Sequence, residues 1–215
     1  RLTDDGTLDA SFNTGIGFSS YVFTIDIDKN NNIYVGGGFT SYKGQSANRI
    51  ICLNEYGAIN ASFNIGSGFN DVVNNIKADD VNNKIYVCGD FTSYRDQSVN
   101  KIVRLNYDGT LDASFNTNFS FLHKYQEYIS VIYYDNDINK IYIGGDFYVE
   151  YNDTSVFSLI RLNYDGTLDT SFQPEFYSEF EPADFDKKYT SINSITLDKD
   201  RNILYVGGTI YNQDD

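Results

Sequence analysis

The sequence predicts an all-β fold built from a short unit that recurs about four times along the chain. Three sequence blocks recur together in the same order, which indicates an internal repeat. The 215 residues are rich in Tyr and Phe, which favour strands, and contain 17 Gly, which favours turns. A long amphipathic helical pattern is not present in the sequence.

The strongest block ends in the motif Asp-x-Ser-Phe. It reads RLTDDGTLDASF from Arg1, CLNEYGAINASF from Cys52, RLNYDGTLDASF from Arg104 and RLNYDGTLDTSF from Arg161. The second block reads IYVGGGF from Ile33, IYVCGDF from Ile85, IYIGGDF from Ile141 and LYVGGTI from Leu204. A third, weaker block places an isoleucine three positions after an aliphatic residue, at Val22, Val73, Ile129 and Ile192. Blocks that keep one register through four copies define a repeating unit.

Each period contains four short strand candidates separated by turn residues. In the second period they are Val73–Ala78, Lys84–Phe91, Lys101–Asn106 and Thr110–Phe115. A four-stranded unit of this period predicts a β-propeller, in which antiparallel sheets pack face to face as blades. We expect a single propeller over residues 1–215, with repeats at 1–21, 22–72, 73–128, 129–191 and 192–215, the first and last of them partial.

The chain opens at the third strand of one unit and closes after the second strand of another. Two interpretations follow. The two halves could join into one composite blade and close a ring of four, or the chain could be an excerpt of a larger propeller. The first residue is not Met, which favours the excerpt.

The segment from Asn106 to Thr110 suits a three-residue hairpin loop with a glycine in the left-handed region. This register places Arg104 opposite Asp112, and it pairs Arg1 with Asp9 and Arg161 with Asp169. In the remaining copy the partners are Cys52 and Asn60, so both charges are lost together. That joint change predicts a cross-strand ion pair. The Gly-Gly steps within the second block predict a bulge or a close backbone approach between blades.

The sequence gives little support for a catalytic site or a metal-binding site. There is one His and only two Cys, so a serine triad or a histidine-based metal site is not expected. Paired aspartates recur at Asp26/Asp28, Asp79/Asp80, Asp135/Asp137 and Asp198/Asp200. They could bind calcium, but the EF-hand spacing is absent, and we interpret them as Asx turns. We expect no catalytic residue, metal site or cofactor, and buried free thiols at Cys52 and Cys88.

The net charge of the chain limits the kinds of partner that we expect. Thirty acidic and 16 basic residues give a net charge of −14, which argues against nucleic acid as a partner. The sequence lacks an apolar run of roughly 20 residues, so membrane insertion is not expected.

The string RLNYDGTLDASFN, followed by a V-x-x-I strand and IYVGGDFTSY-like segments, resembles the delta-sixty repeat, a β-propeller repeat. The resemblance covers essentially the whole chain; it departs at Cys52, Asn60, Cys88 and in the long inserts of the last two periods. It implies a tail-associated phage protein of the virion or a bacterial surface or secreted protein, and it implies no catalytic residues.

We therefore predict a non-enzymatic structural or interaction module that binds other protein chains of an assembly. The expected contacts are the longest inserts, where aromatic residues alternate with acids. The candidate binding residues are His123, Tyr125, Phe176, Tyr177, Glu179, Phe180, Glu181 and Phe185. A module that recognises a surface glycan is the first alternative, and a glycan-cleaving enzyme with acids from the inserts is the second.

Overall fold

The computed structural model describes residues 1–121, 128–151, 154–174 and 190–209. These residues form sixteen β-strands and no helix, which confirms the all-β prediction. No described segment forms a helix long and apolar enough to cross a membrane.

The strands group into four antiparallel units. The first unit is the sheet β1 (Val22–Ile27), β2 (Ile33–Gly37) and β5 (Ile50–Leu53), with a small hairpin of β3 (Ser41–Tyr42) and β4 (Gln45–Ser46). The second repeats it with β6 (Val73–Asp79), β7 (Lys84–Gly89) and β10 (Ile102–Asn106), and with the small hairpin β8 (Ser93–Tyr94) and β9 (Gln97–Ser98). The third contains β11 (Ser120–Phe121), β12 (Tyr128–Asp135), β13 (Lys140–Tyr151) and β14 (Thr154–Asn163). The fourth is the pair β15 (Ser191–Asp198) and β16 (Ile203–Thr209).

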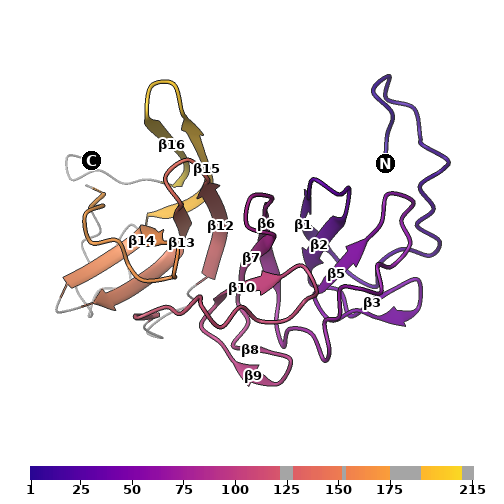
Figure 1. The fold of residues 1–215 in the computed structure, drawn as a ribbon, viewed down its shortest axis with the longest axis horizontal. Helices are drawn as coiled ribbons and strands as arrows, with labels where there is room; N and C mark the ends of the chain where they lie inside the picture. The colour runs from indigo at the N-terminus through magenta and orange to yellow at the C-terminus, as the bar shows by residue number, and fades with distance from the viewer. Residues whose placement is uncertain (122–127, 152–153, 175–189, 210–215) are drawn as a thin grey trace.

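The four sheets stand side by side in an open arc (Figure 1). Their first strands are neighbours, because β1 contacts β6, β6 contacts β12 and β12 contacts β15. This stack of sheets around a line of first strands is the arrangement of propeller blades. The described residues form a partial propeller without a closed ring, and Arg1 and β16 lie at opposite ends of the arc (Figure 1).

The first two main sheets have three strands and not the predicted four, because the expected fourth strand is almost absent, whereas the third sheet has four strands with β11 among them. Of the segment Thr110–Phe115, only Leu111 pairs with the third strand, as an isolated bridge to Leu105. The chain then turns, because the Asp112 carboxylate accepts a hydrogen bond from the Ser114 backbone N–H at 3.0 Å. Single bridges of the same kind join Leu2 to Leu8, Leu53 to Ile59 and Leu162 to Leu168.

The Gly-Gly steps serve two purposes, as predicted. The first glycine faces the next blade: a Cβ at Gly36 would lie 2.4 Å from Val73 Cγ1. The second lies against a bulge in its own sheet, where the pairing shifts register between Val22 and Thr24, and a Cβ at Gly37 would lie 2.2 Å from the Tyr21 carbonyl oxygen. Bulges at the equivalent place interrupt β6, β12 and β15.

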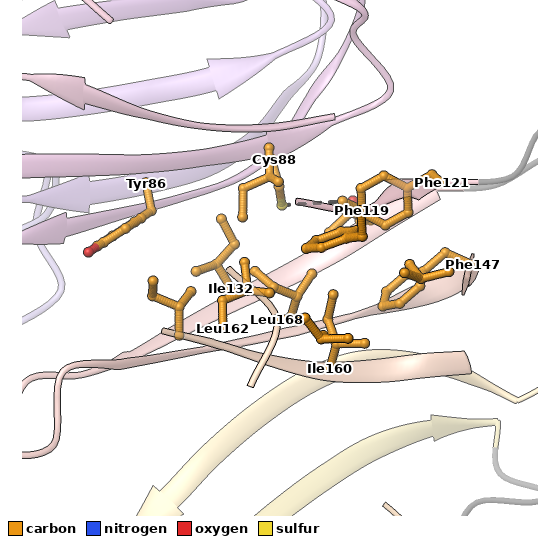
Figure 2. Close-up of a cluster of buried hydrophobic side chains, with 14 of the residues drawn as sticks. Tyr86, Cys88, Phe119, Phe121, Ile132, Phe147, Ile160, Leu162 and Leu168 are labelled. Carbon is orange, nitrogen blue, oxygen red and sulfur yellow. Dashed lines mark hydrogen bonds between the residues drawn. The ribbon is translucent and has the colours of Figure 1, made fainter. Parts of the chain in front are cut away.

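The core consists of layers between neighbouring blades. Figure 2 shows the layer between the second and third sheets, where Tyr86 and Cys88 of β7 face Ile132, Ile160 and Leu162 of the third unit. Cys88 occupies the position of Gly36, is fully buried and is a free thiol, and Cys52 is likewise buried and free. The prediction of buried thiols is therefore confirmed.

Candidate interaction surface

One end of each sheet is made of tight turns held by their own side chains. The Asp28 carboxylate accepts hydrogen bonds from the backbone N–H groups of Asn30 and Asn32, at 2.8 and 2.9 Å, and from the Tyr34 hydroxyl at 3.1 Å. Asp79 binds the backbone N–H groups of Val81 and Asn82 in the same way. These contacts confirm the Asx-turn interpretation. Across the described residues, no three His, Cys, Asp or Glu side chains gather as metal ligands.

The hairpin turns that follow the third strands lie at the same end. The Tyr107 hydroxyl donates to Asp80 at 3.1 Å, which ties the hairpin turn to the turn between the first two strands. Gly109 has φ +84° and its N–H donates to the Asn106 carbonyl at 2.9 Å, as the three-residue loop requires. The other hairpin glycines also have positive φ, at Gly6, Gly57 and Gly166.

The predicted ion pairs are present and belong to a larger network. Arg104 Nε donates to Asp112 Oδ2 at 2.8 Å, and Lys84 Nζ lies 2.9 Å from the same oxygen. Arg104 Nη2 donates to the Ser114 hydroxyl at 3.0 Å, and that hydroxyl donates to Asp112 Oδ1 at 2.7 Å. The serine hydroxyl of the repeat motif is therefore held by the arginine and aspartate side chains. Equivalent contacts join Arg161, Asp169, Lys140 and Ser171.

The network also joins one blade to the next. Arg104 Nη1 donates to the carbonyl oxygen of Tyr164 in the following hairpin turn, and the Tyr164 ring lies 4.2 Å from the guanidinium carbon. Arg1 Nη1 reaches the Glu55 carbonyl in the same way, at 2.6 Å. Arg104 is only 1% exposed, so the predicted cross-strand pair is part of a buried network.

In the first unit the whole network is replaced by neutral groups. Asn32, Cys52 and Asn60 occupy the positions of Lys84, Arg104 and Asp112. Asn60 Nδ2 donates to Asn32 Oδ1 at 2.9 Å, where the other units have a lysine–aspartate pair. The sequence analysis identified two positions of this exchange, those of Cys52 and Asn60. It missed the third, that of Asn32.

The electrostatics of the network follow from its contacts. Burial alone would raise the pKa of Asp112, but hydrogen bonds from Ser114, Lys84 and Arg104 lower it well below its usual range. In the neutral unit, burial raises the pKa of the Cys52 thiol to about 12, so this cysteine is not a reactive thiolate. Neither group is suited to donate or accept a proton near neutral pH.

The remaining connections lie together along the outer edge of the blades. We call residues 38–49, 64–72, 90–101 and 116–121 the rim. Phe69 bridges to Tyr94 there, and the Tyr94 hydroxyl donates to the Gly109 carbonyl at 2.7 Å. Asn100 Nδ2 holds the next linker through the Phe119 carbonyl, at 2.8 Å.

In the first two units, one phenylalanine of the linker that precedes the first strand packs on the connection between the second and third strands. Phe18 packs on Phe39 and Tyr42, with ring centroids 4.6 and 4.5 Å away. Phe69 packs on Phe91 and Tyr94, at 4.2 and 4.3 Å. Phe119 contacts Phe121, at 5.5 Å. One phenylalanine per linker therefore packs on the rim in the first two units, and the third linker uses two.

Among the described residues, two hollows interrupt the rim. The larger, of about 500 Å³, is lined by residues 97–100, 102–104, 111–113, 115–117 and 119–120. A smaller one of about 240 Å³ lies one unit earlier, between Asn48 and Arg49 on one side and Ser93 and Asp96 on the other. Both hollows are open and mostly polar, and neither brings together a nucleophile and a base.

All eight sequence-predicted binding residues lie outside the described residues. His123 and Tyr125 belong to the segment 122–127. The other six, Phe176, Tyr177, Glu179, Phe180, Glu181 and Phe185, belong to 175–189. They remain predictions.

A family model described as domain of unknown function (DUF5122) beta-propeller matches three segments of the chain, residues 29–63, 82–115 and 139–172. Each match begins at the turn before a second strand and ends at the Asp-x-Ser-Phe phenylalanine, or its Asn-x-Ser-Phe equivalent at Phe63. No curated protein matches the chain. The three matches and the stack of sheets identify the chain as a β-propeller repeat protein.

Proposed function

We propose that this chain is a non-enzymatic interaction module of the delta-sixty repeat type, within a tail-associated phage protein of the virion or a bacterial surface protein. Its partners are other protein chains of the assembly, and it needs no cofactor. The contacts come from the long linkers between blades, and the blades themselves act as the scaffold that presents them.

The observation that supports this proposal is the small number of aromatic residues that the described linkers use to pack on the rim. A ten-residue spacing separates Phe12 from Val22 and Phe63 from Val73, and each of these linkers uses one phenylalanine to seal the rim. The spacing from Phe172 to Ile192 is 20 residues, and the segment between them contains Phe176, Tyr177, Phe180, Phe185 and Tyr189. These are more aromatic residues than rim packing uses, and surplus aromatics among acids suit a contact with a basic protein surface.

A non-enzymatic role agrees with the chemistry of the ion-paired and turn aspartates, although burial raises the pKa of Asp90 and of Asp146. A glycosidase needs one carboxylic acid with a raised pKa opposite a second carboxylate. Asp112 and Asp169 are held ionised by their arginine and lysine partners, and the turn aspartates accept hydrogen bonds from their own turns.

The direct test deletes residues 174–188, joined by a short Gly-Ser linker, and measures assembly with the partner chains of the particle or surface layer. The proposal predicts lost binding with an unchanged unfolding midpoint. The matched control replaces Val81, an exposed turn residue of the second unit, with serine. Unchanged binding together with lost thermal stability would show that the insert packs on its own blade.

A carbohydrate-binding module is the second candidate, because the hollow of about 500 Å³ is polar and is bordered by Phe115 and Phe119. A glycan array tests it, with Gln97→Ala and Asn116→Ala as variants of the hollow. Hydrolysis of a bound glycan, abolished by substitution of glutamates such as Glu179 or Glu181, would replace both proposals with an enzyme.

A further inference from the structure

Asp-Gly steps occur in the hairpin turns of the chain, at Asp5, Asp108 and Asp165. An Asp-Gly step isomerises readily without an enzyme, because glycine has no Cβ to hinder attack by its backbone nitrogen on the aspartate side chain. The first unit has Tyr56-Gly57 at this position and contains no such step. The second and third units each have one, in the turn that follows the third strand.

The reaction at Asp108 has two steps. The Gly109 nitrogen forms a bond to Asp108 Cγ, the Cγ–O bond of the protonated carboxyl breaks, and the hydroxyl leaves as water with the amide proton. Water then opens the resulting five-membered imide. Attack at Cγ restores aspartate, whereas attack at the main-chain carbonyl leaves isoaspartate, in which the backbone runs through Cγ and is one methylene longer. The folded chain therefore controls the reaction through the freedom of this side chain and this peptide group.

The side chain that would react is held by the threonine two positions later. Asp108 Oδ1 accepts hydrogen bonds from the Thr110 backbone N–H at 2.9 Å and from the Thr110 hydroxyl at 2.6 Å. Asp165 and Thr167 make the same contacts, at 3.0 and 2.7 Å. The hydrogen bonds from Thr110 also lower the pKa of Asp108, so they oppose the protonated carboxyl from which water leaves.

The peptide group that would react is held on both sides. The Gly109 N–H donates to the Asn106 carbonyl at 2.9 Å, and the Asp108 carbonyl accepts from the Asn64 N–H of the preceding unit, also at 2.9 Å. Imide formation rotates this peptide plane toward Cγ, and the rotation requires both hydrogen bonds to break. The third unit has the same two hydrogen bonds, at 3.0 and 2.8 Å, from Gly166 to Asn163 and from Asn116 to Asp165.

The docked turn also leaves no room for the product. A Cβ at Gly109 would lie 2.5 Å from the Asn64 carbonyl oxygen, and a Cβ at Gly166 would lie 3.0 Å from the Asn116 nitrogen. An extra backbone methylene beside contacts this close does not fit unless the neighbouring unit moves. A hairpin that has formed isoaspartate is therefore expected to stay undocked.

We propose that Asp108 and Asp165 are spontaneous isoaspartate sites that stay closed while their hairpins are docked on the preceding unit and open when the hairpins undock. Isoaspartate at Asp108 then marks separation of the first and second units, and isoaspartate at Asp165 marks separation of the second and third. The mark is lasting, because the longer backbone no longer matches the docked turn.

Peptide mapping by mass spectrometry is the first test, on the whole chain incubated near neutral pH in buffer or in guanidinium chloride. It measures the isoaspartate fraction at each site over time. The proposal predicts formation at least roughly tenfold slower in buffer at both sites, because the open hairpin is a minor population there. Equal rates in buffer and in denaturant at either site would overturn the proposal.

A matched pair of variants tests the threonine contact. Thr110→Val removes the hydroxyl that binds Asp108 and keeps the side-chain shape, whereas Thr110→Ser keeps the hydroxyl. We expect Thr110→Val to raise isoaspartate formation at Asp108 by roughly threefold to tenfold, the rate equivalent of one hydrogen bond, and Thr110→Ser to stay near the parent rate. Asp165 in the same chain is the internal control. No rise at Asp108, or an equal rise at Asp165, would count against the proposal.

Asn118→Ala tests the link to docking without changing Asp165 or Thr167. Asn118 Oδ1 accepts a hydrogen bond from the Leu168 N–H at 3.0 Å, so it joins the linker before the third unit to the third hairpin. Its loss should raise isoaspartate formation at Asp165 by roughly threefold and leave Asp108 unchanged. A rate at Asp165 that does not respond to Asn118→Ala would show that docking does not control the site, and the proposal would fail.

Discussion

Replacing Arg104 with alanine should destabilise the protein far more than replacing Arg1, although the two residues occupy the same repeat position. Arg104 is 1% exposed, and its guanidinium binds Asp112, Ser114 and the Tyr164 carbonyl. The Arg1 side chain makes the equivalent contacts but is 38% exposed. Solvent can replace its hydrogen bonds, so its loss should have a small effect.

The magnitude follows from burial. Removing Arg104 leaves Asp112, itself 9% exposed, with Lys84 as its remaining cation, and it leaves a backbone carbonyl without its donor. Breaking a buried ion pair by removing one partner costs about 3–5 kcal/mol, because a charge stays buried without full compensation. The triple variant Lys84→Asn, Arg104→Cys, Asp112→Asn reproduces the neutral set of the first unit and removes the charges together. It should cost less than Arg104→Ala alone.

Urea unfolding followed by circular dichroism at pH 7 measures all three variants against the parent chain. We expect Arg104→Ala to lose the most free energy of unfolding, the triple variant less, and Arg1→Ala the least. A loss below about 1 kcal/mol for Arg104→Ala would place it among exposed pairs and refute the reasoning. A triple variant less stable than the single one would refute the idea that the three residues act as a unit.

The folded-state pKa of Asp112 is lowered, so its contribution is present above its unfolded pKa of about 3.9 and is lost as pH falls from about 5 toward the folded value. Asp112→Asn should therefore flatten the acid limb of a stability–pH curve, and an unchanged limb would exclude this carboxylate as its source. Tyr94→Phe leaves a buried carbonyl without its donor and should cost about 1–3 kcal/mol in urea unfolding. Tyr42→Phe should cost less, because a neighbouring lysine also donates to the same carbonyl at 2.9 Å; equal losses would contradict this. Gly109→Ala and Gly6→Ala both force alanine into the left-handed region, at about 1–2 kcal/mol, but only the first brings a Cβ within 2.5 Å of a carbonyl in the preceding unit. The excess loss at Gly109, measured by thermal melting, reports the contact between blades, and no excess would mean that the contact relaxes freely.

The sequence predicted features whose causes are local. The left-handed glycine at Gly109 sets the hairpin register, and that register alone places Arg104 opposite Asp112. The third network member was not predicted because Lys84 comes from a neighbouring strand, 20 residues before Arg104 in the sequence. Its signal was present in the sequence, since lysine stands directly before the Ile-Tyr of the second block in the two units that also have the later Arg–Asp pair, and asparagine stands there in the unit that has Cys52.

The fourth strand was overestimated for a related reason. Residues 110–115 alternate like a strand, but the Asp112 side chain captures the Ser114 N–H and ends the ladder. The rim hairpins β3–β4 and β8–β9 were not predicted, because two-residue strands such as Ser93–Tyr94 are too short to show a period. The candidate binding residues follow from insert length and composition alone, and their test is experimental.

The neutral and charged sets also limit how such units can diverge after duplication. A lineage passing from Lys84, Arg104 and Asp112 to Asn32, Cys52 and Asn60 by single substitutions crosses intermediates that bury an unmatched charge. Copying a whole unit avoids those intermediates, whereas drift at one position meets them. Recombination inside a unit keeps these charges matched when the exchanged stretch carries Arg104 and Asp112 together, from the third strand through the hairpin. The inherited module therefore extends beyond the RLNYDG string to Asp112, and chimaeras cut between Arg104 and Asp112 should be purged while chimaeras cut before the third strand persist.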